Sequence, residues 1–380
     1  MPDYLISRSR HPASRDTGTS VCVVGGGVIG LLTARELADA GASVTVVERG
    51  EPGREASWAG GGILSPLYPW QTPDAVNALA RWGQERYAQL AQALKDETGI
   101  DAEWTQSGLL CLDTTQQAEA LAWAERTNVA LQVLTKFAVK MREPSVSDAV
   151  DSALWLPDVA QIRNPRLLRA LLQSLMKRRV RILKHCEVTG LRFEQNQMTG
   201  VDSTHGRITA DTVIVAGGAW SGQLLAGLGL NLEITPVRGQ MLMWRAKPGL
   251  VKRIIVQGEH YLIPRRDGVV LTGSTVEHVG FDKSTTPSGL NELKAAAISM
   301  VPALAYSQVE QHWAGLRPGS PQGVPYIGAH PGIKGLYVNT GHFRNGLALA
   351  PASARLMADI VLGRTPVIDP APYALQLANG

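Results

Sequence analysis

The stretch VCVVGGGVIGLLTARELADAGASVTVVE, residues 21–48, decides the fold. An apolar run over 21–24 leads into Gly25, Gly27 and Gly30, and an alanine- and leucine-rich segment is followed by a second apolar run that ends at Glu48. This order predicts a strand, a tight turn, a helix and a second strand. In such a unit the first glycine permits the turn, the second lets the backbone approach a pyrophosphate, and the third lets helix and strand pack closely.

The same unit predicts a dinucleotide site. The N-terminus of the helix offers free N–H groups and a partial positive charge to phosphates. Glu48 lies 18 residues after Gly30, where its carboxylate can accept hydrogen bonds from a ribose diol. Three spaced glycines alone could form an ordinary turn, but both strands, the helix and the acid in order favour the cofactor site. The predicted binding residues here are Gly25, Gly27, Val28, Ile29, Gly30 and Glu48.

Composition places the chain among ordinary globular proteins, with one large domain or two intermingled domains in 380 residues. The net charge is +4 and the sequence pI about 9.0, but the basic residues are spread along the chain. The densest basic run, residues 177–181, ends a predicted helix, where the helix dipole favours positive charge. We therefore expect no nucleic-acid partner.

Other sequence signals concern location and metals. No apolar run reaches the roughly 18 residues of a membrane span, and the first twenty residues lack the apolar segment of a secretory signal. We expect residues 1–19 to be a flexible tail and the protein to be cytoplasmic. The three cysteines, Cys22, Cys111 and Cys186, have no metal-ligand spacing, so we expect no metal site.

The segment RGEPGREASWAGGGIL, residues 49–64, departs from a nicotinamide-binding unit, which would continue promptly into another strand–helix crossover. A glycine triplet opens a long loop instead. Residues without bulky side chains let something large and flat, such as a flavin ring, lie close to the backbone. The predicted cofactor-binding residues in this segment are Arg49, Glu55, Ala56, Ser57, Gly60, Gly61 and Gly62.

The rest of the chain predicts an α/β fold in two domains. Helices are expected over residues 73–98, 116–126, 164–179, 288–300 and 347–362, with Asn164 capping the third. Strands are expected over 108–112, 181–190 (including Val188), 213–216, 239–244, 261–264, 268–274 and 335–339. The run 213–216 is a buried parallel strand that opens into a small-residue turn with Ala216 and Gly217, where ligands bind in such sheets. The predicted cofactor-binding residues in these strands and turns are Val188, Ala216 and Gly217.

We therefore expect a discontinuous, Rossmann-like cofactor domain and a second α+β domain built on a mixed antiparallel sheet. The first comprises residues 20–85, 150–235 and 316–380. The second, which would bind the substrate, comprises residues 86–149 and 236–315.

Four further motifs give the chain a family resemblance. They are REASWA at 54–59, YLIPR at 261–265, WAGLRPG at 313–319 and GHFRNG at 341–346. Together, and in this order, they resemble the D-amino acid oxidase family of flavoproteins, over residues 21–369. The resemblance implies non-covalent FAD, a two-domain fold and often a homotetramer.

The resemblance also implies roles for residues in these motifs. The Tyr261 hydroxyl would contact the substrate carboxylate and Arg317 would clamp it, so these two are the predicted catalytic residues. Arginine offers two parallel N–H donors that match a carboxylate. Without the motifs, Tyr261 could be a core residue and Arg317 could pair with a surface acid. Arg344 resembles an arginine near the substrate, and the predicted flavin-contacting segment is His342, Phe343, Arg344, Asn345, Gly346, Leu347 and Ala348.

The implied reaction is the oxidation of glycine, or of another small amino acid such as sarcosine or D-alanine, by oxygen. It would give the imino acid, then glyoxylate, ammonia and hydrogen peroxide, and the imine would supply the thiazole moiety of thiamine. A hydride leaves the α-carbon and the amine proton can pass to solvent, so we do not assign His342 as a general base. The alternative is a dehydrogenase that passes electrons to a quinone or a protein.

Two positions depart from relatives of the family. Some glycine-oxidising relatives have a methionine fifteen residues after the substrate tyrosine, whereas this chain has Val276, which leaves pocket size and substrate range open. Relatives that attach flavin covalently use a cysteine in the C-terminal third. The last cysteine here is Cys186, so we expect no covalent bond.

Overall fold

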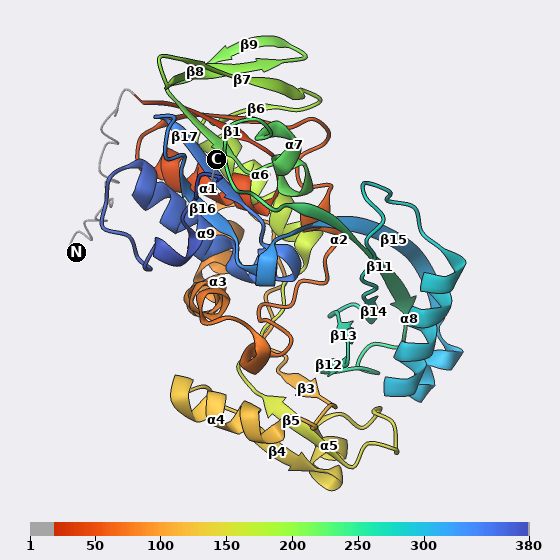
Figure 1. Cartoon of the computed structure of the whole chain (residues 1–380). Helices are drawn as coiled ribbons and strands as arrows, with labels where there is room; N and C mark the ends of the chain where they lie inside the picture. Colours follow the sequence, from red (N-terminus) through yellow and green to blue (C-terminus); the bar gives the residue numbers. More distant parts are fainter. Residues whose placement is uncertain (1–18, 379–380) are drawn as a thin grey trace, which may run out of the picture.

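The structure is a computed structural model that describes residues 19–378 (Figure 1). The predicted N-terminal tail lies almost entirely outside these residues. The predicted strand–turn–helix–strand unit is confirmed as β1 (Ser20–Val24), α1 (Val28–Asp39) and β2 (Ser43–Val47). Gly30 is required where α1 crosses β1, because a Cβ there would overlap the Gly25 carbonyl oxygen.

The first sheet has six strands in the order β16-β17-β10-β1-β2-β6. All neighbours are parallel except β16 (Tyr326–Ala329), which pairs antiparallel with β17 (Leu336–Thr340) at one edge. The expected buried strand is β10 (Thr212–Val215), and β6 (Arg181–Leu183) forms the other edge. Valine, isoleucine and leucine fill these strands, as expected for strands buried on both faces.

Helices cover this sheet and share its core. α1 packs along α9 (Gly346–Val361), which in turn packs along α3 (Asp74–Thr98), and α6 (Asn164–Lys177) contacts both α1 and α3. Leucine and alanine dominate the shared core, and the small alanines let the helices approach closely. α3 ends as predicted at Gly99, whose left-handed backbone (φ 75°) accommodates the turn.

The second sheet has eight strands in the order β15-β11-β14-β13-β12-β3-β5-β4 and extends in Figure 1 from β15 and β11 on the right to β4 at the bottom. Neighbours are antiparallel except β12 and β3, which are parallel. α8 (Pro287–Met300) packs against it, while α4 (Gln117–Thr127) and α5 (Lys136–Arg142) lie at its far end. The α/β class with a second mixed sheet is thus confirmed. The strands are β15 (Gln308–Gly319), β11 (Thr235–Arg245), β14 (Val269–Gly273), β13 (His260–Pro264), β12 (Ile254–Gln257), β3 (Leu109–Cys111), β5 (Ser152–Leu156) and β4 (Gln132–Thr135).

Two local predictions were wrong. The strand expected over 181–190 is two strands, because the chain turns after Leu183: His185 has a positive φ of 53°, and Cys186 N–H returns to the Glu48 carbonyl. The second part, β7 (Val188–Glu194), joins β8 (Gln197–Ser203) and β9 (Gly206–Thr209) in a separate antiparallel sheet. Asn164 does not cap α6 either, since its side-chain amide points into the loop before α3.

The sheets cross the expected domain limits in two places. β5 pairs with β3 and β4 in the second sheet, although residues 150–235 were expected with the first. β15 runs through the limit at 315/316 as one long strand beside β11. A single strand carries no signal for the sheet it joins, so the domain division itself stays a prediction.

All three cysteines are free and buried. Burial raises the pKa of the Cys22 and Cys111 thiols to about 12. Across residues 19–378, no group of three or more histidine, cysteine, aspartate or glutamate side chains is placed to hold a metal ion. Within the same residues, no helix combines the length and apolar character that crossing a membrane would require.

Candidate active site

A cavity of about 740 Å³ lies between the two sheets, within the range of small-molecule sites. It opens at the carboxyl ends of β1, β2, β10 and β17, and β11, β13 and β15 of the second sheet close it. The predicted site residues that line it are Gly25, Gly27, Val28, Ile29, Glu48, Arg49, Glu55, Ala56, Ser57, Gly60, Gly61, Gly62, Val188, Ala216, Gly217, Tyr261, Arg317, His342, Phe343, Arg344, Asn345, Gly346 and Leu347.

Two predicted cofactor residues are not among the lining residues. Gly30 lies one helical turn behind the glycine turn, in the contact between α1 and β1. Ala348 is buried, and its carbonyl faces Gly83 of α3 so closely that a Cβ at Gly83 would overlap it. Both residues therefore contribute to helix packing behind the cavity wall and do not form part of the wall.

The glycine turn and Glu48 form one end of the cavity. Gly25 has a φ of 114°, and a Cβ there would overlap the Ala216 carbonyl oxygen, so the turns after β1 and β10 touch through their backbones. The Glu48 carboxylate accepts from Gly26 N–H at 2.8 Å and from Gly50 N–H at 2.9 Å. Each carboxylate oxygen has a second acceptor site, so both can still accept from a ribose diol. These residues therefore fit a dinucleotide.

The loop between β2 and α3 is held from two sides. Val28 N–H, expected to face phosphate, donates to Ser57 Oγ at 2.9 Å. Asn164 Nδ2 donates to the carbonyls of Ser57 at 2.9 Å and Gly60 at 2.8 Å. Sequence reasoning missed Asn164, which also lines the cavity, because its only signal was the Asn-Pro pair of a helix start.

Arg317 enters the cavity from β15. Its Nη2 donates to Ser274 Oγ at 2.7 Å and its Nη1 to the Thr275 carbonyl at 3.2 Å, so both partners are neutral. The guanidinium lies over Gly239, where a Cβ would overlap it. Burial is the main cause that lowers the pKa of Arg317, although the group stays cationic at neutral pH. A half-buried cation with neutral partners is well placed to receive an anion.

Tyr261 lies beside Arg317 and is 9% exposed. Its hydroxyl donates to the Met241 sulfur at 3.3 Å, and both side chains line the cavity. Sequence reasoning missed Met241, which comes from β11. Val276, the position considered for pocket size, is 38% exposed and is not a lining residue, so Met241 limits the room beside Tyr261 instead.

Arg344 and His342 have partners within the protein. Arg344 forms an ion pair with Glu259, and both line the cavity. His342 is 2% exposed, and its Nε2 lies 3.0 Å from Ser353 Oγ in α9. Burial lowers the pKa of His342 from 6.5 to about 3, so the ring is neutral near pH 7. This arrangement gives no support to a general-base role.

The loop between β14 and α8 contacts residues of the cavity wall from outside. The Arg49 guanidinium lies 3.4 Å from the ring centroid of Trp220, and Phe281 of this loop lies 5.5 Å from the same ring. Lys283, two residues further on, pairs with Glu55 at 2.9 Å. Arg49, Glu55 and Trp220 line the cavity, and sequence reasoning missed Trp220, Phe281 and Lys283.

A glycine turn with an acid after the second parallel strand, facing an arginine from an antiparallel sheet, is typical of a dinucleotide-dependent oxidoreductase. Residues 20–360 match the family described as "FAD dependent oxidoreductase". The chain belongs to this family, and its cofactor is FAD.

Individual relatives agree with this assignment. The chain is 51% identical to a glycine oxidase of Pseudomonas aeruginosa over 93% of this chain and 98% of the relative. The crystal structure of a glycine oxidase from Geobacillus kaustophilus superimposes with a TM-score of 0.90 at 31% identity, covering 95% of this chain and 100% of that one. A bifunctional protein ThiO/ThiG of Nostoc is 32% identical over 90% of this chain, which spans 52% of that longer relative.

Proposed function

We propose that this protein is a glycine oxidase. The observation that carries the proposal is Arg317, a half-buried cation with only neutral partners, beside the Tyr261 hydroxyl in the cavity. The high identity to proteins named glycine oxidase supports the same substrate. The overall reaction would convert glycine, oxygen and water to glyoxylate, ammonia and hydrogen peroxide, through the imino acid.

Arg317, Tyr261 and Met241 form one wall of the cavity, here called the substrate wall, which would bind and orient a small amino acid. Arg317 would hold the carboxylate through two parallel N–H donors, and Tyr261 would turn its hydroxyl from Met241 to the same carboxylate. Met241 and the Arg344–Glu259 pair limit the space around that position, which favours glycine, sarcosine and D-alanine over larger amino acids. The neutral His342 takes no proton, so the amine proton would pass to solvent.

The other wall, here called the cofactor wall, consists of the lining residues that follow β1, β2, β10 and β17, and it would hold FAD without a covalent bond. Bound FAD supplies the chemistry, because it accepts the hydride that leaves the α-carbon. Glu48 would bind the ribose diol and the Gly25–Gly27 turn would let the pyrophosphate approach. Residues 342–345 precede α9, and residues 346–347 begin it; the N-terminus of this helix would stabilise negative charge on the reduced ring.

The wider role belongs to the same proposal. Since this chain is similar to one half of the protein named ThiO/ThiG, we propose that its imine product supplies the thiazole moiety of thiamine. Oxygen as acceptor, a homotetramer and a cytoplasmic location complete the proposal.

Anaerobic stopped-flow mixing with glycine, followed by oxygen, tests this function. We expect glycine to bleach the flavin, and oxygen to restore its colour with one hydrogen peroxide formed per flavin. Slow recovery with oxygen but fast recovery with a quinone would show the dehydrogenase instead. Bleaching by none of glycine, sarcosine and D-alanine would contradict the proposal. Acid precipitation should leave a colourless pellet, since a yellow pellet would show covalent flavin.

A further inference from the structure

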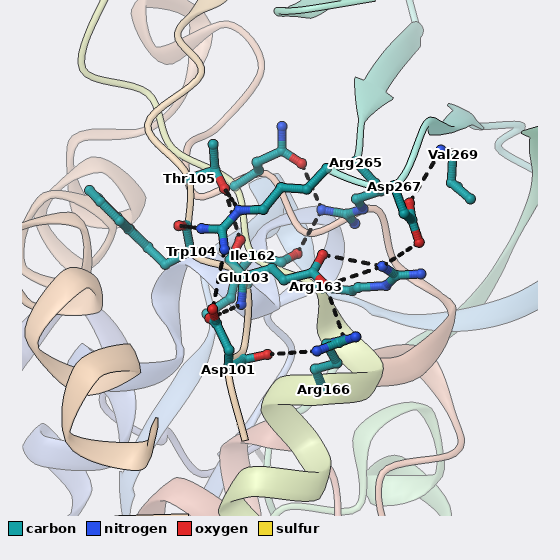
Figure 2. Close-up of polar contacts among 12 residues, drawn as sticks. Asp101, Glu103, Trp104, Thr105, Ile162, Arg163, Arg166, Arg265, Asp267 and Val269 are labelled. Carbon is teal, nitrogen blue, oxygen red and sulfur yellow. Dashed lines mark hydrogen bonds and ion pairs between the residues drawn. The ribbon is translucent and has the colours of Figure 1, made fainter. Parts of the chain in front are cut away.

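Arg265 is a buried arginine, 9% exposed, at the end of β13. Figure 2 shows its guanidinium reaching toward Ile162. Nη1 donates to Gln161 Oε1 at 2.7 Å and to the Ile162 carbonyl at 3.0 Å, and Nη2 donates to the Gly61 carbonyl at 2.7 Å. All three acceptors are neutral, so this buried cation is held by dipoles rather than by a direct carboxylate partner.

The Gly61 contact connects Arg265 to both walls of the cavity. Alternate residues of a strand share one face, so Tyr261 and Ile263 lie on the same face of β13, and Arg265 directly follows this strand. A Cβ at Gly61 would lie 2.5 Å from Ile263 Cδ1 and 3.0 Å from Tyr261 Cε2, which shows that the glycine loop rests on that face. Gly61 and Tyr261 both line the cavity.

The segment before α6 also contacts the glycine loop, residues 60–62. Ile162 N–H donates to the Gly62 carbonyl at 2.9 Å, and a Cβ at Gly62 would overlap the Ile162 carbonyl oxygen. The Arg265 guanidinium therefore bridges the cofactor loop, residues 60–62, and the segment 161–164, from the strand that carries Tyr261.

The neighbouring charges in Figure 2 serve a different purpose. Arg163 pairs with Glu103 at 3.2 Å and with Asp267 at 2.8 Å, and Arg266 pairs with Asp101 at 3.2 Å. The Arg163–Asp267 and Arg266–Asp101 pairs hold the β13–β14 turn at the surface, where ion pairs contribute little, whereas the Glu103 side chain is only 11% exposed. Arg265 differs because a buried charge is costly to desolvate, and stability alone does not explain why it is kept.

We infer that Arg265 is a positioning residue that fixes the distance between the cofactor loop at Gly61 and the substrate residue Tyr261, and thereby the rate of hydride transfer. The inference rests on the proposed function. Only a planar guanidinium can satisfy these three acceptors at once, so Arg265→Lys should repair the loss in part. The pKa of Arg265, lowered by burial to about 10, leaves the group charged at neutral pH.

The test compares Arg265→Met with Arg266→Met in the FAD-loaded enzyme. Arg266 is the matched control, because it belongs to the same turn and cluster but contacts Trp104 and Thr105 rather than the cofactor loop. For Arg265→Met we expect the limiting rate of flavin reduction at saturating glycine to fall about tenfold to hundredfold, as for a displacement of about 1 Å between reacting groups. The dissociation constant of acetate, which probes the Arg317 clamp alone, should change less than about threefold.

FAD affinity gives a readout that does not depend on the substrate. Arg265→Met should bind FAD about three- to tenfold more weakly, and Arg266→Met should match wild type, because only Arg265 holds the Gly61 carbonyl with a charge-assisted hydrogen bond. Wild-type reduction rate and FAD affinity in Arg265→Met would overturn the inference. An equal fall in acetate affinity and reduction rate would also overturn it, because Arg265 would then act on substrate binding.

A milder variant covers the case in which Arg265→Met does not fold. Gln161→Ala removes one of the three acceptors and should lower the reduction rate about threefold to tenfold with unchanged acetate affinity. An unchanged rate in Gln161→Ala would overturn the inference in that case. Failure of glycine to reduce wild-type flavin would overturn the proposed function alone, whereas a weaker affinity of Arg265→Met for FAD would still support the positioning role.

Discussion

The two walls of the cavity differ in whether backbone or side chains form them. The cofactor wall is mostly backbone, in turns that follow parallel strands, and its glycines allow contacts that a Cβ would block. The substrate wall is made of side chains, Arg317, Tyr261 and Met241, from three antiparallel strands. A wide, flat cofactor is held by many weak backbone contacts, whereas a small substrate depends on few strong ones. Substitutions in the two walls should therefore differ in which step they damage and by how much.

The largest effect is expected at Arg317 in the substrate wall. Removing one partner of a buried charge pair costs about 3–5 kcal/mol. Arg317→Ala should therefore lower kcat/KM for glycine by about a hundredfold to several thousandfold. Arg317→Lys should recover only part of this, and bound FAD should stay unchanged. Methylamine, which lacks a carboxylate, should gain relative to glycine in Arg317→Ala. If both substrates fall by the same factor, Arg317 is structural.

The next effect is expected at Glu48 in the cofactor wall. A hydrogen bond to a charged acceptor is worth about 1.5–3 kcal/mol, so Glu48→Ala should raise the dissociation constant of FAD about tenfold to a hundredfold. Turnover per bound flavin should stay near the wild-type value, because Glu48 lies at the far end from Arg317. Equilibrium titration of the apoprotein measures the affinity. Glu51→Ala is the matched control, since Glu51 pairs outward with Lys184 and His185. Equal affinities in both variants would place the ribose elsewhere.

A third effect concerns pH and His342, a buried residue of the cofactor wall. The pKa of His342 is about 3 in the folded protein and 6.5 when exposed, so the unfolded chain binds the extra proton between these values. Stability should therefore fall as the pH drops below 6.5, by about 2 kcal/mol at pH 5 from this residue.

Unfolding by guanidinium chloride, with saturating FAD at pH 7.5 and at pH 5, measures this change in the free energy of unfolding. His342→Gln should lose less stability than wild type on acidification, whereas the exposed His205→Gln should behave as wild type. The same pH dependence in all three proteins would show that His342 does not titrate as described. Because His342 stays neutral, the pH profile of kcat should carry no break from it between pH 6 and 9.

The smallest effect is expected at the loop between β14 and α8, which contacts the cofactor wall from outside. Lys283 pairs with Glu55 at the surface, where an ion pair is worth about 0–1 kcal/mol. Lys283→Met should accelerate FAD dissociation no more than about fivefold, and the difference should shrink in high salt because of screening. The exposed Lys247→Met, in the turn after β11, serves as control. A dissociation rate equal to that of the control would show that the pair does not help to retain FAD.

The same contrast between the walls explains what could be predicted from the sequence. The glycine turn and Glu48 are close together in the chain, so spacing alone predicts how they meet in space. Asn164, Met241 and Trp220 reach the cavity from segments that carry no motif, and only the tertiary fold brings them there. The turn at 184–187 was missed because no glycine or proline marks the place where the backbone leaves the sheet.

The buried cysteines have a consequence for the lifetime of the enzyme. Peroxide attacks thiolates rather than thiols, and the raised pKa values keep Cys22 and Cys111 protonated. Cys186 is equally shielded from solvent. If the protein releases hydrogen peroxide at every turnover, as proposed above, Cys22 and Cys111 would thus be protected from it, whereas Cys186, although buried, lines the cavity in which it forms. Oxidation should first affect surface methionines such as Met141 and Met176, which are 67% and 69% exposed and lie outside the cavity.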